Sequence, residues 1–131
     1  MIKKMFLALT VIALNLFSHS ALAQENGVII EWAPFSVVEG VSDEALIEMS
    51  QRLQSEFLEK QHGFIKRDLL KSPDGGWVDL VYWASEEDAQ LAMKNSMESA
   101  ICGEYFGLMV MDEHAEPGAG VLHFTKKAGW E

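Results

Sequence analysis

Two segments of this chain are apolar at nearly every position, and they constrain its fold more than any other feature. In residues 28–38 the apolar side chains belong to both side-chain parities, and residues 77–83 read Trp-Val-Asp-Leu-Val-Tyr-Trp. A strand with one face in water alternates apolar and polar residues. Both faces of these two predicted strands should therefore be covered. Pro34 cannot donate to a ladder, so it marks an edge, a bulge or a bend in the first strand.

Two further strands complete the predicted sheet. Residues 64–71 run into Ser-Pro-Asp-Gly-Gly at 72–76, which is strong turn chemistry, and the strand 77–83 follows at once. This pattern predicts an antiparallel hairpin. A last strand is expected at residues 121–125, after an irregular stretch from 104 to 120.

Two helices are expected between these strands. Ser42 is a plausible N-cap for the first, which carries apolar residues at positions 46, 49, 53 and 57, and Gly63 is a suitable stop. Ser85 and Asp88 form a capping box for the second, whose narrower face is rich in small residues and methionine and which should end at Gly103.

The element order strand, helix, strand, strand, helix, strand is that of the ferredoxin-like βαββαβ arrangement. The predicted fold class is therefore α+β, with a four-stranded antiparallel sheet. Two helices can cover only one face of such a sheet, and an exposed contiguous patch of large apolar side chains is rare on soluble monomers. A sheet-to-sheet homodimer, which closes a dimeric α/β barrel, is expected to cover the other face.

Residues 1–23 have the pattern of a secretory signal peptide. A basic start at Lys3 and Lys4 precedes an apolar run, and Ala21-Leu22-Ala23 fits the small-x-small cleavage rule. An uncleaved anchor is the alternative, but the apolar run is shorter than the about 20 residues that a span needs. We expect export, followed by a single domain over residues 24–131 that is periplasmic or secreted and free of the membrane.

The charge of the chain excludes several partners. It holds 10 basic and 20 acidic residues, for a net charge of −10, and loss of Lys3 and Lys4 would make the mature chain more acidic still. Such a surface repels nucleic acid and anionic lipid. Cys102 is the only cysteine, so no internal disulfide can form. It is either a small buried hydrophobe or a candidate for pairing between chains.

The chain resembles a known family in three respects: its element order, Gly63-Phe64 between the first helix and the second strand, and residues 79–89, Asp-Leu-Val-Tyr-Trp-Ala-Ser-Glu-Glu-Asp-Ala. These are similar to the antibiotic-biosynthesis-monooxygenase-like domain of the dimeric α/β-barrel superfamily. The resemblance implies the fold and the dimer predicted above. Proteins of this fold include oxygenases, haem-degrading enzymes, decarbonylating or dehydrating stress proteins and members without known activity.

One feature of that family is missing here. Many of its members carry a histidine nine or ten residues after the tryptophan that ends the third strand, on the helix face that looks into the pocket. The corresponding turn of this chain holds Ala92, Met93 and Lys94. A proton-transfer role or axial haem ligation at that position therefore does not carry over.

The three histidines of residues 24–131 have different expected roles. His123, in the last strand, is the candidate catalytic residue if it points into a pocket between sheet and helices, and a core or cross-strand histidine is the alternative. His62 should lie near the negative end of the first helix, where a cation is favoured. His114 lies in the acidic run 111–116, which we interpret as a solvated loop, and no metal site is expected.

Four residues are candidates for the wall of a ligand pocket. Trp32 and Trp83 could hold a flat apolar ligand, or they could fill the core or the dimer interface. Met93 and Met97 add adaptable apolar surface that suits a pocket or simple gap filling.

Two classes of function follow. The first, which the resemblance implies, is a monooxygenase-like enzyme without a cofactor, whose apolar cavity confines a small aromatic or apolar substrate while dioxygen reacts. The second is a non-catalytic exported dimer that binds a small planar ligand such as haem.

Overall fold

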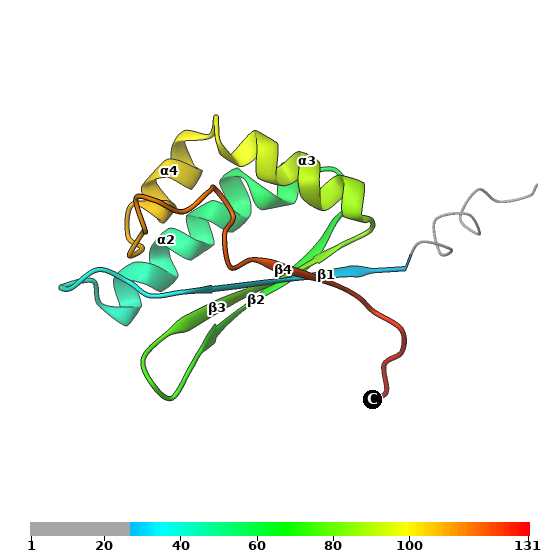
Figure 1. Cartoon of the computed structure of the whole chain (residues 1–131), viewed down its shortest axis with the longest axis horizontal. Coiled ribbons are helices and arrows are strands. Elements are labelled where there is room, and N and C mark those ends of the chain that lie inside the picture. Colours follow the sequence, from blue (N-terminus) through cyan, green and yellow to red (C-terminus); the bar gives the residue numbers. More distant parts are fainter. Residues whose placement is uncertain (1–26) are drawn as a thin grey trace, which may run out of the picture.

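The computed structural model describes residues 27–131, so the expected signal peptide lies outside the described residues. Four strands form one antiparallel sheet in the order β2-β3-β1-β4 (Figure 1). In chain order the elements are β1 (Ile29–Phe35), α2 (Asp43–Glu56), the 3₁₀ turn η1 (Leu58–Lys60), β2 (Phe64–Lys71), β3 (Trp77–Trp83), α3 (Glu86–Ser96), α4 (Ala100–Phe106) and β4 (Leu122–Thr125). The predicted ferredoxin-like α+β architecture is confirmed.

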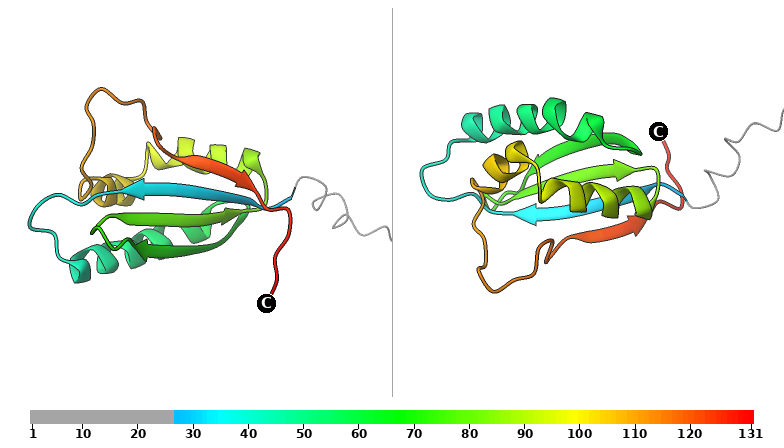
Figure 2. Two further views of the ribbon diagram at one scale, coloured as in Figure 1. Left: turned by 60° about the horizontal axis from the view of Figure 1, so that its bottom comes forward. Right: turned by 90° about the horizontal axis from the view of Figure 1, so that it is seen from above.

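All three α-helices cover the same face of the sheet, and the core lies between the two layers (Figures 1 and 2). Side chains alternate across a strand, so every second residue of β1 and β3 points at the helices. The largest fully buried side chains are those of Trp83, Tyr105, Leu46 and Cys102. Burial of Cys102 confirms the first of its two expected roles. Within residues 27–131 no helix is long and apolar enough to cross a membrane.

The other face of the sheet is apolar and has no helix over it. The residues of β1, β2, β3 and β4 that alternate away from the helices include Trp32, Leu70, Leu80, Tyr82, Leu122 and Phe124. Four of these are exposed, at 39% for Trp32, 42% for Leu70, 54% for Leu122 and 51% for Phe124. We call this surface the open face. Helices cover only half of the apolar sheet surface, as the sequence predicted.

The helical segments end earlier than the sequence indicated. Ser42 caps α2 as expected, but α2 stops at Glu56 and the 3₁₀ turn follows, so Gly63 does not end the helix. The second helical segment is divided in two. Ser99 accepts a hydrogen bond from the Cys102 N–H and begins α4, which places Gly103 inside a helix instead of at its end. The physical reason is that a serine hydroxyl satisfies a free backbone N–H and starts a new helix after α3 has closed.

Gly63 has a different task, which is to bring β2 against the start of α3. Its φ is +77°, a conformation that residues with a Cβ adopt only under strain. A Cβ at this position would collide with the carboxylate of Asp88. That carboxylate is held by the Ser85 hydroxyl, 2.8 Å away. Gly63 therefore permits both the turn and the close approach.

We expect Gly63→Ala to lower the free energy of unfolding by about 3 kcal/mol or more, because backbone strain adds to the collision with Asp88. Gly40→Ala is the matched control, since Gly40 has φ +90° with nothing within 4 Å of an added Cβ. In the control the free energy of unfolding should fall only by the backbone strain, about 1–2 kcal/mol. Chemical denaturation measures both, and equal losses would contradict the close-approach argument.

Candidate functional site

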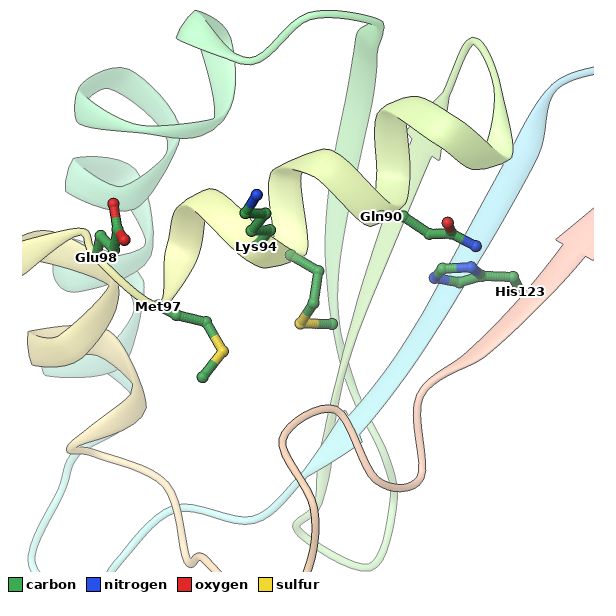
Figure 3. A pocket seen from close by; sticks show the side chains of 6 residues that line it. Gln90, Lys94, Met97, Glu98 and His123 are labelled. Atoms are coloured by element: carbon green, nitrogen blue, oxygen red, sulfur yellow. The ribbon is translucent and has the colours of Figure 1, made fainter.

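An open apolar groove of about 560 Å³ lies between α3 and β4. Its lining comes from α3 and the two residues that follow it, with His123 of β4 at one end (Figure 3). A Cβ on Gly118 would lie 3.2 Å from Cε of Met93, so the loop before β4 runs close to the groove. The lining residues are Gln90, Met93, Lys94, Met97, Glu98 and His123.

The groove lies at the edge of the sheet–helix interior. The sequence predicted a cavity between the two layers, but Trp83 and Tyr105 fill that space in a single chain. Both side chains are fully buried members of the hydrophobic core. The open groove of a single chain therefore lies along α3 and not behind it.

His123 is held between two carboxylates from two other elements. Its Nδ1 lies 2.6 Å from Oε1 of Glu86, which begins α3, and its Nε2 lies 3.0 Å from Oε2 of Glu31 on β1. Exposure of the side chains falls along this row, from 46% for Glu86 to 21% for His123 and 13% for Glu31. We call these three residues the histidine clamp. It fastens the edge strand β4 to both the sheet and the helix layer.

The clamp changes the titration of its members. Burial raises the pKa of Glu31, and the hydrogen bond and charge of His123 offset this only in part. Burial lowers the pKa of His123, but the hydrogen bonds and charges of Glu86 and Glu31 together outweigh it, so the pKa of His123 is raised. Oxygen acceptors on both sides favour an imidazolium that donates both of its N–H groups.

The clamp lies between two hollows of the surface. His123 lines the groove, whereas Glu86 lines a second hollow on the other side, with Ile29, Ser85, Glu87 and Thr125. The two carboxylates contact different ring nitrogens, so the three groups do not converge on one point as metal ligands do. Among residues 27–131 there is no group of three His, Cys, Asp or Glu side chains placed to hold a metal ion.

The residues predicted to line the pocket separate into three places. Met93 and Met97 line the groove. Trp83 is buried in the core, where it meets Phe64 edge to face at 5.8 Å. Trp32 is on the open face, because it lies three positions along β1 from Ile29, the residue that pairs with Trp83. The two tryptophans thus lie on opposite faces and cannot line one pocket within a single chain.

The indole N–H of Trp83 has no hydrogen-bond partner. Within the described part of the chain it is the only buried side-chain nitrogen or oxygen in this state. Buried donors are nearly always satisfied, and one without a partner calls for an acceptor such as a water or a ligand atom. The indole N–H of Trp83 is therefore a buried donor that can still donate to a partner of this kind.

A buried polar cluster joins β2, β3 and α4. Arg67 donates from Nε to Oδ1 of Asp79 at 2.8 Å and from a terminal nitrogen to the Tyr105 hydroxyl at 2.9 Å, and Tyr105 donates to Oδ2 of Asp79 at 2.8 Å. Burial raises the pKa of Asp79, and the charge of Arg67 and the hydrogen bonds of Tyr105 and Arg67 offset part of that rise. Burial also raises the pKa of Tyr105. Each member satisfies the others, as a structural ion pair must.

The sequence did not indicate which side chains contact His123 or Asp79. Glu31, Glu86 and His123 are far apart in the sequence and meet only through the register of β1 with β4 and the start of α3. One signal for the buried cluster was present, since Asp79 is the only charged residue in an apolar strand. A carboxylate there needs a cation, but nothing in the spacing designates Arg67.

The two other histidines of residues 27–131, His62 and His114, lie on the surface. His62 does not cap a helix as expected, because its Nδ1 lies 2.6 Å from Oδ1 of Asp88. The hydrogen bond to Asp88, and then its charge, raise the pKa of His62. His114 is exposed in the loop before β4, where its backbone N–H donates to Asp112.

Three solved structures show what the fold is similar to. SnoaB, a cofactor-independent oxygenase from Streptomyces nogalater, matches with a TM-score of 0.59 and 15% identity over 79% of this chain and 96% of its own. A monooxygenase from the gene ActVA-Orf6 of Streptomyces coelicolor, in complex with the ligand Nanaomycin D, matches with a TM-score of 0.54 and 19% identity over 80% and 91%. A conserved protein from Methanosarcina mazei Go1 gives 0.56 and 18% over 79% and 97%.

The chain therefore has the fold of antibiotic-biosynthesis-monooxygenase-like domains, as its resemblance to that family implied. No family model and no curated protein matches its sequence. At such low identity the likeness establishes the arrangement of strands and helices. Function has to be argued from the residues of the groove and the clamp.

The histidine clamp should make stability depend on pH. Since the folded-state pKa of His123 lies above its ordinary value of about 6.5, the stabilisation is complete below that pH and is lost as pH rises through the raised pKa. Between pH 6 and 9 we expect the unfolding free energy of the wild type to fall more steeply than that of His123→Gln.

His62→Gln is the control for this pH series, measured by urea denaturation. Its imidazole also has a raised pKa, but the side chain is 85% exposed, so solvent screens its interaction with Asp88. Its pH dependence should remain close to that of the wild type. Parallel curves for the wild type and His123→Gln would contradict the clamp.

Proposed function

We propose that this chain is a monooxygenase-like enzyme that needs no cofactor and oxidises a small aromatic or apolar substrate bound along the α3–β4 groove. One observation carries the proposal: a titratable imidazole, paired with two carboxylates, stands at the end of a groove whose floor is methionine and the stems of longer side chains. The fold shared with oxygenases is consistent with it.

The reaction class fits what such a groove supplies. An electron-rich phenolic ring becomes more reducing when it loses a proton, and its anion can react directly with dioxygen. In the balanced reaction the phenol loses the hydrogens of its O–H and of one ring C–H, both carbons become C=O, one atom of dioxygen enters the product and the other leaves with the two hydrogens as water. The protein has to bind the ring, exclude water and hold the exchanged proton.

Each part of the site has a role in this scheme. Met93 and Met97 provide adaptable contacts to the ring, as thioethers do. His123 exchanges the proton once Glu86, the more exposed of the two carboxylates, releases Nδ1, while Glu31 keeps the imidazole in place through Nε2. Lys94, on the rim, can attract the phenolate oxygen by its charge.

The proposal includes a sheet-to-sheet homodimer of an exported protein. The open face supports the dimer, because Trp32, Leu122 and Phe124 are large, apolar and exposed on it. Burial of such a surface against a second copy stabilises the dimer by roughly 25 cal/mol for each Å² of apolar area removed from water. Export rests on the signal-peptide pattern of residues 1–23.

His123→Gln should lower turnover at least about 100-fold, because general acid–base groups contribute roughly 10²–10⁴ to rate. The measurement is oxygen uptake by the mature chain with an electron-rich fused-ring phenol. His114→Gln, which alters an exposed loop imidazole, should leave turnover unchanged.

The outcomes separate catalysis from structure. If His123→Gln keeps its turnover and loses only stability, His123 fastens β4 and is not a catalytic residue. If the wild type takes up no oxygen but added haem changes its absorbance on binding, the non-catalytic planar-ligand module predicted from the sequence is favoured instead.

Phe124→Arg should disrupt the dimer, since it places a charge on the open face. Leu91→Arg is the control, because Leu91 of α3 has a comparable exposure of 46% against 51% for Phe124. In sedimentation velocity we expect the wild type and the control to be dimers and Phe124→Arg to be a monomer. A dimer that survives Phe124→Arg but not Leu91→Arg would place the interface on the helices.

A further inference from the structure

Residues 126–131 follow β4 without joining any strand or helix, and all of them are exposed. The backbone N–H of Lys126 still donates to the Val28 carbonyl at 2.8 Å, which fixes the direction in which the segment leaves the sheet. We call residues 126–131 the arm. Its Trp130 is 90% exposed, the highest value among the exposed large apolar side chains of residues 27–131.

The direction of the arm is informative. In Figure 1 the helices lie on one side of the sheet, and the arm turns to the opposite side, where the open face lies. An extended chain covers about 3.3 Å per residue, so the arm can reach about 20 Å. Sheets that pack face to face are about 10 Å apart. The arm is thus long enough to cross from one sheet to another stacked on the open face.

We propose that the arm crosses to a second copy of this chain and buries Trp130 against that copy, so that the two protomers exchange arms. This inference rests on the dimer of the proposed function and goes beyond it, since packing of the two open faces does not by itself require the arm. Twofold symmetry supplies the same contact twice.

Two properties suit the arm to this partner. Trp130 offers a large apolar ring, and the exposed apolar side chains of the open face offer a matching surface, which includes Trp32 and Leu122. The arm also carries Lys126 and Lys127, while the whole chain has a net charge of −10. Cations delivered to an acidic partner reduce the repulsion between two such copies.

The first test is the dimer dissociation constant of the mature chain, measured by sedimentation over a concentration series. Trp130→Ala should raise it at least about tenfold, because a buried tryptophan is typical of the residues that dominate an interface. Met111→Ala, in the exposed loop before β4, is the control and should leave it unchanged. An unchanged constant for Trp130→Ala would overturn the arm exchange and leave the dimer intact.

The second test locates the ring directly. A photoreactive benzoylphenylalanine replaces Trp130, and the irradiated protein is analysed on a denaturing gel and by peptide mapping. Arm exchange predicts a species of doubled mass, with the crosslink in a sheet strand of the other copy. Crosslinks confined to one chain would overturn it. A wild type that stays monomeric at every concentration would instead refute the proposed dimer.

Discussion

The structure depends on the antiparallel pairing of β1 with β3 at the centre of the sheet. Both strands are apolar on both faces, so both faces have to be covered. Each strand also has a further strand on its outer side, β2 beside β3 and β4 beside β1. The helices cover one face with a core built around Trp83 and Tyr105. The charged cluster of Arg67 and Asp79 is tolerated inside that core because every charge in it is paired.

The candidate site is a consequence of how β4 is attached. This short edge strand pairs only with β1, and a long exposed loop precedes it, so its position relative to α3 needs a further contact. His123 supplies that contact to Glu86 and Glu31. The same residue that closes the fold at this edge also stands at the end of the groove. The function that we propose would therefore combine a structural and a chemical role in one imidazole.

Local sequence signals described individual elements well. The bounds of β2 and β3 follow from the turn at residues 72–76, and Ser42 and Ser85 cap their helices through the backbone N–H groups that they were expected to satisfy. The expected single helix after Ser85 was wrong, because Ser99 competes as a second cap. Of the two alternatives for Trp32 and Trp83, a pocket shared within one chain is disfavoured, because strand parity puts the two rings on opposite faces.

The sequence by itself determined the element order, the fold class and the need to cover two apolar faces, because these follow from periodicity, caps and turns that act over a few residues. Tertiary structure alone decided which side chains meet. Glu31 and His123 are brought together by strand register, and Arg67 and Tyr105 by the packing of α4 over β2. Register and packing are set by the whole buried surface at once, so no local pattern contains them.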